Sequence, residues 1–208
     1  MSGHRTERSS ASRPNAKAGL LIVVLLWSVS AVAQRVAIDK THSTVTVRVF
    51  KSGLLSGLAH NHVIQATIAA GSLDARDRAI ELSFNVADMK VVDPEGSDSE
   101  RQQIEATMKG PKVLDMAQFP VINFTSRQIT SPGQNRYQAT GELKLHGAAR
   151  QVSVPVDFRD GRYLGSLTLK QTDYGVVPVK IAGGTVRVKD EIVIEFQIVS
   201  AIANEMHP

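Results

Sequence analysis

Two histidines separated by one residue form the most unusual polar cluster in this sequence. His60 and His62 flank Asn61, and in an extended strand residues i and i+2 point to the same face. Two imidazoles on one face can bind Zn²⁺ or Cu²⁺ if a third ligand joins them. The sequence offers three candidates for that ligand, namely His42, His146 and Asp39. The alternative interpretation is a polar rim of hydrogen-bonding imidazoles, since two histidines are fewer than a metal site usually needs and no HExxH motif accompanies them.

The adjacent pair His42 and Ser43 invites comparison with a serine hydrolase. Neighbouring residues in a strand point to opposite faces, so this histidine cannot act as the base for this serine. The sequence also lacks the GxSxG motif that carries the nucleophile in many hydrolases. We therefore expect no catalysis at this pair and interpret His42 as a hydrogen-bonding residue at the start of the first long strand.

Four acidic residues lie close together in the middle of the chain, at positions 93, 95, 98 and 100. Their spacing does not match the DxDxDG pattern of a calcium loop. Ser97 and Glu100 instead have the spacing of a helix capping box, which predicts a helix over Glu100–Lys109 that ends at Gly110-Pro111. Asp98 and Glu100 then lie at the positive end of that helix.

The composition excludes several classes of protein. The chain has 208 residues, which predicts a single domain. It contains no cysteine, so a disulfide scaffold, a thiolate nucleophile and an iron–sulfur cluster are excluded. With 42% hydrophobic and 21% charged residues, it is typical of a globular protein.

Residues 1–33 are typical of a secretory signal peptide. A basic segment precedes an apolar run over residues 18–32, and Ala31-Val32-Ala33 matches a cleavage site. The run of about 15 residues is shorter than the roughly 20 that span a bilayer. We expect cleavage after Ala33, a mature domain over residues 34–208, and a periplasmic or secreted location.

Cleavage would also remove most of the positive charge. Residues 1–33 hold four basic residues and one acidic residue, so the formal net charge falls from +4 to about +1. A nearly neutral domain does not have the basic surface that nucleic-acid binding requires. We therefore expect no nucleic-acid partner.

The mature chain alternates apolar and polar residues in the manner of half-buried antiparallel strands. The clearest alternation covers residues 44–50, 80–87, 140–145, 151–158 and 192–199. Weaker strands are predicted over residues 63–70, 121–130, 163–170 and 185–189. Asp160-Gly161 is the strongest hairpin signal. About eight to ten strands with one helical insertion predict a β-sandwich or a closed barrel, and a barrel of eight strands can hold one slender ligand.

Four segments, spread along the mature chain, are each similar to a motif of one protein family. They are VAIDKTHS at 36–43, MKGPKVLDMAQFPVINF at 108–124, GELKLHG at 141–147, and Asp173-Tyr174-Gly175 ahead of the last strand. They are similar to an I-D-x-x-H-S opening, a helix followed by a Y/F-P-x-I-x-F strand, a G-x-L-T-L-x-G strand, and a D-F-G segment. In that order they resemble the YceI-like family of exported, lipocalin-like barrels that bind polyisoprenoid lipids. The resemblance covers roughly residues 36–200.

The resemblance implies an all-β, antiparallel, lipocalin-like barrel of about eight strands with one short helical insertion. It also implies a protein that is not an enzyme and that binds, transports or stores a polyisoprenoid or similar apolar lipid in the barrel. The residues expected to face this ligand are Val45, Val47, Val49, Leu82, Phe84, Val86, Phe124 and Leu143. We expect His42, His60 and His62 to meet the head group at the rim.

One segment departs from the family pattern and keeps a second hypothesis open. Residues 53–63 read GLLSGLAHNHV, where many members have a G-x-x-x-G-x-F loop. The alternative function is therefore a periplasmic metal-binding or redox-stress protein that uses His60 and His62. An enzyme acting on an apolar substrate inside the barrel is a third class, which no motif supports. The sequence leaves open a homodimer and a transient contact with a membrane surface.

Overall fold

The computed structural model describes residues 3, 35–52, 61–74, 78–181 and 185–201. The chain divides into two compact units, Met1–Val32 and Ala33–Pro208, and every element described below belongs to the second. The signal peptide predicted over residues 1–33 lies outside the described residues except for Gly3, and His60 lies outside them too. Among the described residues, no helix is both long enough and apolar enough to cross a membrane.

Most of the described chain is β-strand. The first half contains β1 (Arg35–Ala37), β2 (Thr44–Ser52), β3 (His62–Gln65), β4 (Ile68–Asp74), β5 (Ala79–Asn85), the short 3-10 helix η2 (Val86–Asp88), β6 (Lys90–Val91) and α1 (Asp98–Lys109). The second half contains β7 (Val121–Gly133), β8 (Arg136–Leu145), β9 (Ala148–Arg159), β10 (Arg162–Lys170), the 3-10 helix η3 (Gln171–Tyr174), β11 (Lys180–Ile181) and β12 (Val186–Val199).

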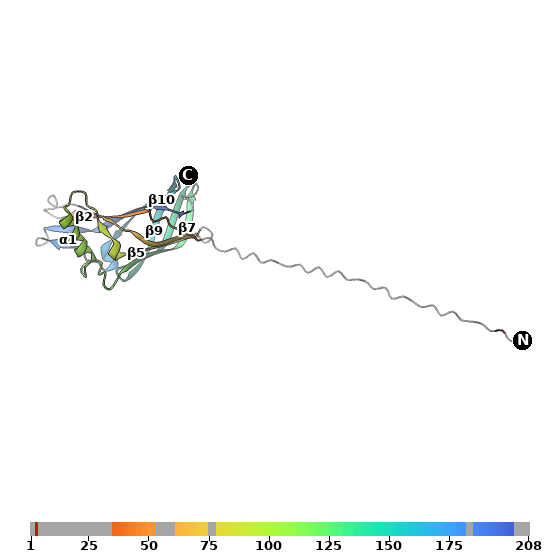
Figure 1. The fold of residues 1–208 in the computed structure, drawn as a ribbon, viewed down its shortest axis with the longest axis horizontal. Coiled ribbons are helices and arrows are strands. Elements are labelled where there is room, and N and C mark those ends of the chain that lie inside the picture. The colour runs from red at the N-terminus through yellow and green to blue at the C-terminus, as the bar shows by residue number, and fades with distance from the viewer. Residues whose placement is uncertain (1–2, 4–34, 53–60, 75–77, 182–184, 202–208) are drawn as a thin grey trace. The chain divides into compact units, whose positions relative to one another are not determined.

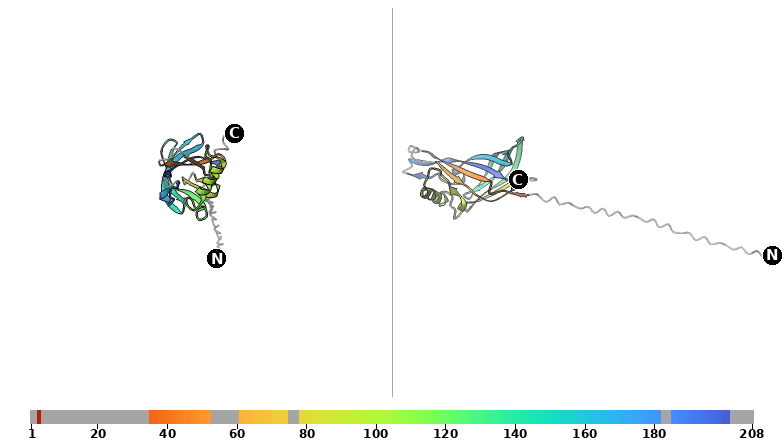
Figure 2. Two further views of the ribbon diagram at one scale, coloured as in Figure 1. Left: turned by 90° about the vertical axis from the view of Figure 1, so that its left-hand side faces the viewer. Right: turned by 45° about the horizontal axis from the view of Figure 1, so that its top comes forward.

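The strands form one antiparallel sheet that curls into a barrel. Its order is β1-β4-β5-β7-β8-β9-β10-β12-β2-β3-β6, with β11 paired to β12. Only Ala66 and Thr67 separate β3 from β4, so this bent ribbon pairs with β2 at one end and with β5 at the other. Strand β6 follows β5 after η2 and pairs with β3. When β3–β4 and β5–β6 are each taken as one bent strand, the ring has the eight strands expected from the sequence, and Figure 2 (left) looks along it.

Strand β1 and the residues after it close a further part of the wall. β4 pairs with β5 along one edge and with β1 along the other. β2 pairs with β3 and does not extend along β4. Ile38 then forms a bridge with Ser200, and the Asp39 amide donates to the Val199 carbonyl at 2.8 Å. The start of the domain is therefore hydrogen-bonded to the end of β12.

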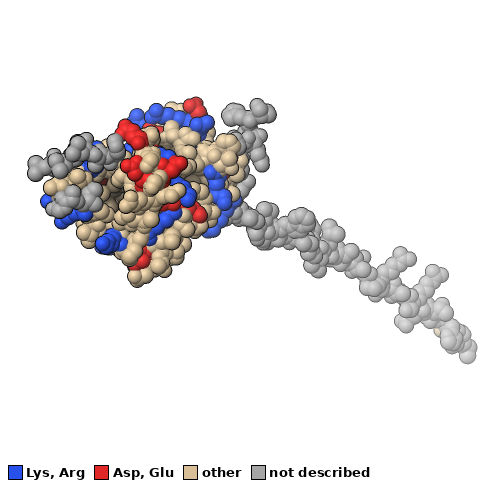
Figure 3. Space-filling view, turned by 60° about the vertical axis from the view of Figure 1, so that its left-hand side comes forward, with Lys and Arg blue, Asp and Glu red and all other residues tan. Residues whose placement is uncertain are grey.

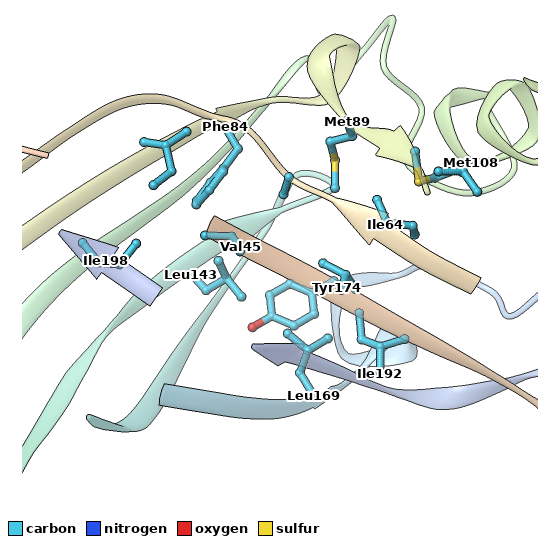
Figure 4. Packing of buried hydrophobic residues seen from close by; sticks show 14 of the residues in the cluster. Val45, Ile64, Phe84, Met89, Met108, Leu143, Leu169, Tyr174, Ile192 and Ile198 are labelled. Atoms are coloured by element: carbon cyan, nitrogen blue, oxygen red, sulfur yellow. The ribbon is translucent and has the colours of Figure 1, made fainter. Parts of the chain in front are cut away.

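The alternating sequence pattern sets which side chains face inward. In β2, Val45 and Val47 are buried whereas Thr44 and Arg48 are exposed. Figure 4 shows that Val45, Leu143 and Ile198, from three different strands, point into the space that the strands enclose. These three residues belong to one buried apolar cluster. The period-two patterns thus identified the correct inward face in these strands.

Tight turns and the helix cap form as their local sequences predict. Asp160 and Gly161 have φ values of 50° and 74°, and His146 and Gly147 have 49° and 75°, which suits the two-residue turns that match strand twist. The Ser97 hydroxyl accepts from the Glu100 amide, and the Glu100 carboxylate accepts from the Ser97 amide at 2.8 Å. The capping box is therefore confirmed.

Four predicted strands have different limits in the structure. The strand predicted over 80–87 ends at Asn85, because the chain turns through η2 before β6 pairs with β3. The strand predicted over 63–70 is two strands, β3 and β4, with the bend between them. The segments at 185–189 and 192–199 form one strand, β12, whose register with β2 shifts between Val188 and Ile192. The first two differences arise where the chain bends between paired segments, and the third is a continuous strand with an irregular register.

The helix α1 lies at one end of the barrel, and the β7–β8 and β9–β10 hairpins extend toward the other (Figure 1). Glu105 attaches the helix to β6, accepting hydrogen bonds from the Val91 amide at 3.3 Å and from the ammonium groups of Lys90 and Lys109 at 3.3 and 2.8 Å. Burial raises the pKa of the Glu105 carboxyl, but the hydrogen bonds together lower it by more. The pKa therefore lies below its ordinary value of 4.5. The helix is thus fixed to the wall by an ionised carboxylate.

Candidate functional site

The barrel encloses a cavity of about 700 Å³, within the range of typical small-molecule sites. Its wall is almost entirely apolar and comes from the inward positions of strands on all sides. Seven of the residues expected to face the ligand line it: Val45, Val47, Val49, Leu82, Phe84, Phe124 and Leu143. Many of these side chains are short, and in a barrel of eight strands such side chains leave room for one ligand.

Aromatic rings pack at the end of the barrel away from α1. The Tyr163 ring lies 4.7 Å from that of Phe158 and 6.4 Å from that of Tyr137, measured between centroids. Tyr163 also lines the cavity. The Phe196 ring lies so close to Gly165 that an added Cβ would stand 2.3 Å from it, so only glycine fits there. Aromatic rings therefore line this end of the cavity, and the Tyr163 phenol is a polar group among them.

Two residues of the predicted ligand set lie elsewhere. Val86 does not line the cavity. It begins η2, where its amide donates a hydrogen bond to the Pro120 carbonyl at 2.9 Å, and the residue is only 1% exposed. His42 does not line it either. Its Nδ1 lies 2.8 Å from Asp39 Oδ2 in the turn before β2, and its side chain is 58% exposed. The sequence pattern could not show either displacement, since both result from chain turns.

The α1 end of the cavity is polar. His62 lies on β3 two residues before Ile64, and both residues line the cavity. The Nδ1 atom of His62 lies 2.7 Å from Asp93 Oδ2. The other carboxylate oxygen, Oδ1, accepts from the Val63 amide at 2.6 Å, and the Asp93 side chain is only 4% exposed. A buried carboxylate therefore orients an imidazole at the mouth of an apolar cavity.

A second, smaller pocket adjoins this mouth. It has a volume of about 290 Å³ and is lined by Lys51, Asn61, Asp93 and Glu95. Lys51 and Asp93 also line the large cavity, so the two spaces share a wall. Figure 3, which brings the α1 end of the barrel forward, shows acidic and basic side chains interspersed on this face. The site thus combines an apolar interior with a polar pocket of mixed charge.

The structure does not assemble the predicted metal site within its described residues. His60 lies outside them, and in the part that is described no group of three histidine, cysteine or acidic side chains could hold an ion. Of the suggested third ligands, Asp39 and His42 bind each other, and His146 Nδ1 lies 3.1 Å from the Tyr174 carbonyl oxygen. Zinc or copper binding by His60 and His62 stays a prediction.

Sequence reasoning missed several residues of the site. Asp93 was assigned to an acidic loop, although it is the partner of His62, and 31 positions separate the two. Met108 and Ile104 bring the apolar face of α1 to the cavity. Figure 4 shows Met89 and Met108 close to the α1 end of the same cluster. The helical period of 3.6 residues could have indicated Ile104 and Met108 on α1, whereas no local signal marks Asp93.

Relatives among curated sequences match part of the chain. A UPF0312 protein of Vibrio parahaemolyticus is 26% identical over 77 residues, which cover 36% of this chain and 41% of that protein. A UPF0312 protein of Pseudomonas savastanoi is 29% identical over 73 residues, or 30% of this chain and 38% of that protein. The chain spans about two-fifths of the length of the curated relatives it matches.

A solved structure shows the same fold, and a second one is similar in part. The crystal structure of Burkholderia cenocepacia BcnA superposes with a TM-score of 0.57 at 21% identity, covering 77% of this chain and 98% of that one. The Campylobacter jejuni YCEI protein gives a TM-score of 0.47 at 13% identity, covering 66% of this chain and 80% of that one.

A family model also matches the chain over most of its length. The model of the YceI-like domain covers residues 37–200, which run from the end of β1 to just beyond β12 and include every wall of the cavity. This span agrees with the four segments that carry the sequence resemblance. The protein therefore belongs to the YceI-like family.

Proposed function

We propose that this protein binds a long apolar lipid, such as a polyisoprenoid, inside the barrel and carries or stores it without chemical change. The observation that supports this is the cavity of about 700 Å³ with its wall of aliphatic side chains. Burying roughly 400 Å² of apolar ligand surface would contribute on the order of 10 kcal/mol before the ligand's loss of freedom is counted. That is enough for stable binding.

A role in binding is favoured over catalysis by the chemistry of the described wall. The charged groups of the described lining gather at the α1 end, and most of the remaining wall is apolar. The His62 ring is hydrogen-bonded to Asp93, and no hydroxyl among the described residues bonds to that ring as a nucleophile would bond to its base. Residues 1–33 support export to the periplasm or the medium, where a carrier could collect its lipid in transient contact with a membrane.

Native mass spectrometry of the full chain, expressed in cells and purified without detergent, tests this proposal. We expect an adduct of lipid mass that organic extraction removes. Val47→Trp puts a bulky ring into the cavity and should weaken rebinding of the extracted lipid about tenfold or more. Val121→Trp is the matched control, because Val121 lies on β7 outside the cavity lining and is 40% exposed.

Two outcomes would contradict the proposal. Equal rebinding by both tryptophan variants would show that the lipid does not occupy the cavity. A chelator-sensitive zinc or copper adduct in place of a lipid, lost on mutation of His60 and His62 to alanine, would support the metal-binding alternative.

A further inference from the structure

We infer that the lipid ends in an uncharged head group with a hydroxyl, as in a long-chain alcohol, and that His62 accepts the hydrogen bond of this hydroxyl. This inference rests on the proposed function and adds the chemistry of the ligand's polar end. It follows from the position of one ring nitrogen and from the charges that surround the cavity mouth.

The first step concerns where the head group of a bound lipid would lie. Aromatic rings line the Tyr163 end of the cavity, whereas the α1 end carries the charged residues of the described lining and joins the polar pocket of about 290 Å³. Lys51 and Asp93 line both spaces. A lipid with its tail in the cavity would therefore place its polar end beside His62, which lies on the same inward face of β3 as Ile64.

The second step concerns the hydrogen on the His62 ring. An ionised carboxylate can only accept hydrogen bonds, so Nδ1 carries the hydrogen that is shared with Asp93 Oδ2 at 2.7 Å. In the neutral ring, Nε2 is then an acceptor. Within the described part of the chain, the contact with Asp93 is the hydrogen bond that His62 makes. As far as the described residues go, the remaining nitrogen is available for a ligand group that donates.

The third step concerns the orientation of this imidazole. Asp93 Oδ1 accepts from the Val63 amide at 2.6 Å, and the Asp93 carbonyl accepts from the Arg101 guanidinium at 2.9 Å. Asp93 is thus held between β3 and α1, and its carboxylate is almost fully buried. Asp93 acts as a positioning residue, which sets the tautomer and direction of the ring without contacting the head group itself.

The fourth step concerns the charge of the head group. The mouth combines two cationic residues, Lys51 and Arg187, with the carboxylates of Asp93, Glu95 and Glu100. A charged head of either sign would therefore meet groups of its own sign, and it would lose water next to an apolar wall. An uncharged hydroxyl avoids both costs, and it satisfies the acceptor on His62.

A competition experiment on the full chain, purified without detergent, tests this inference. The fluorescent apolar probe N-phenylnaphthylamine is bound first and then displaced by hexadecane, hexadecanol, palmitate, hexadecyl phosphate or hexadecylamine, which share one chain length. We expect hexadecanol to bind about fivefold more tightly than hexadecane, the effect of one net hydrogen bond, and more tightly than the three charged ligands.

Substitution of His62 shows whether this preference comes from its ring. In His62→Phe the ratio of the hexadecanol and hexadecane affinities should fall to about one, because phenylalanine keeps a ring but has no acceptor. His42→Phe is the matched control, since His42 also pairs with an aspartate but lies off the cavity; it should keep the fivefold ratio. Circular dichroism of both variants verifies that they fold.

The role of Asp93 has a spectroscopic test. In the wild type, the ¹⁵N chemical shifts of the His62 ring should show the hydrogen on Nδ1. In Asp93→Asn they should show loss of this fixed tautomer, an effect that a purely structural role would not produce. An unchanged tautomer would overturn the positioning role.

The competition results separate failure of this inference from failure of the proposed function. Tightest binding of palmitate, hexadecyl phosphate or hexadecylamine, or a hexadecanol preference that survives in His62→Phe, would overturn the inference while lipid binding stands. If neither the probe nor hexadecane binds, the proposed function itself is wrong.

Discussion

Two histidine–aspartate pairs in this barrel share one contact but have different surroundings. His62 Nδ1 lies 2.7 Å from Asp93 Oδ2, and His42 Nδ1 lies 2.8 Å from Asp39 Oδ2. The side chains of the first pair are 28% and 4% exposed, and those of the second are 58% and 14% exposed. The first pair faces an apolar cavity and the second faces solvent, so equal geometry leads to different chemical roles.

The two pairs also differ in how the chain forms them. Asp39 and His42 are three residues apart, and Asp39 Oδ1 accepts from the amides of Thr41 and His42 at 2.9 and 3.1 Å. This aspartate organises a local turn that leads into β2. Asp93 instead joins β3 to the residues before α1, which only the closed barrel brings together. A pair that connects distant segments should contribute more to stability than a pair within one turn.

The largest expected effect is the loss of stability when Asp93 is removed, compared with the smaller loss when Asp39 is removed. Asp93→Ala leaves the Val63 amide and the His62 ring without their buried partner, and should lower the free energy of unfolding by about 3 kcal/mol. Asp39→Ala should cost much less, because water can reach the groups that it exposes. Urea unfolding of both variants measures the difference, and equal losses would contradict the distinction drawn between the pairs.

A smaller effect should appear in the coupling within each pair. A double-mutant cycle of His62→Ala and Asp93→Ala should give a coupling of about 1.5 kcal/mol, as expected for a charge-assisted contact with little exposure to water. The same cycle on His42 and Asp39 should give a much weaker coupling that declines further with added salt. A stronger coupling at the exposed pair would reverse the comparison.

The smallest effect concerns the titration of Asp39. Hydrogen bonds from the His42 side chain and amide hold the pKa of Asp39 below its ordinary 3.8. Because the folded pKa is lowered, this contribution to stability is present above pH 3.8 and is lost as the pH falls through the folded value. In His42→Ala the pKa should rise toward 3.8, which NMR titration of the carboxyl carbon measures.

Asp190 serves as the internal control for that titration. Its pKa is also lowered, by hydrogen bonds from the Thr172 hydroxyl and amide, and His42 is not among the causes. The Asp190 titration should therefore be the same in the wild type and in His42→Ala. A shift of both carboxyls would indicate a change in the whole fold instead of a lost local bond.

Sequence reasoning predicted the features that depend on nearby residues. The period-two pattern placed Val45, Val47 and Leu143 on the inward face, and the spacing of Ser97 and Glu100 placed the helix cap. It failed where distant strands decide the outcome. The strand ends at Asn85 because β6 must reach β3, and Val86 therefore turns away from the cavity.

The sequence by itself thus determined the strand faces, the tight turns, the helix cap and the family, because these depend on alternation and on contacts between residues close in the chain. Only the tertiary structure decided that the barrel is hollow and that Asp93 meets His62, 31 positions away. The physical reason is that closing the sheet sets the distances across the barrel and between β3 and α1. Because of those distances, the His62–Asp93 pair lines the cavity, whereas the similar His42–Asp39 pair does not.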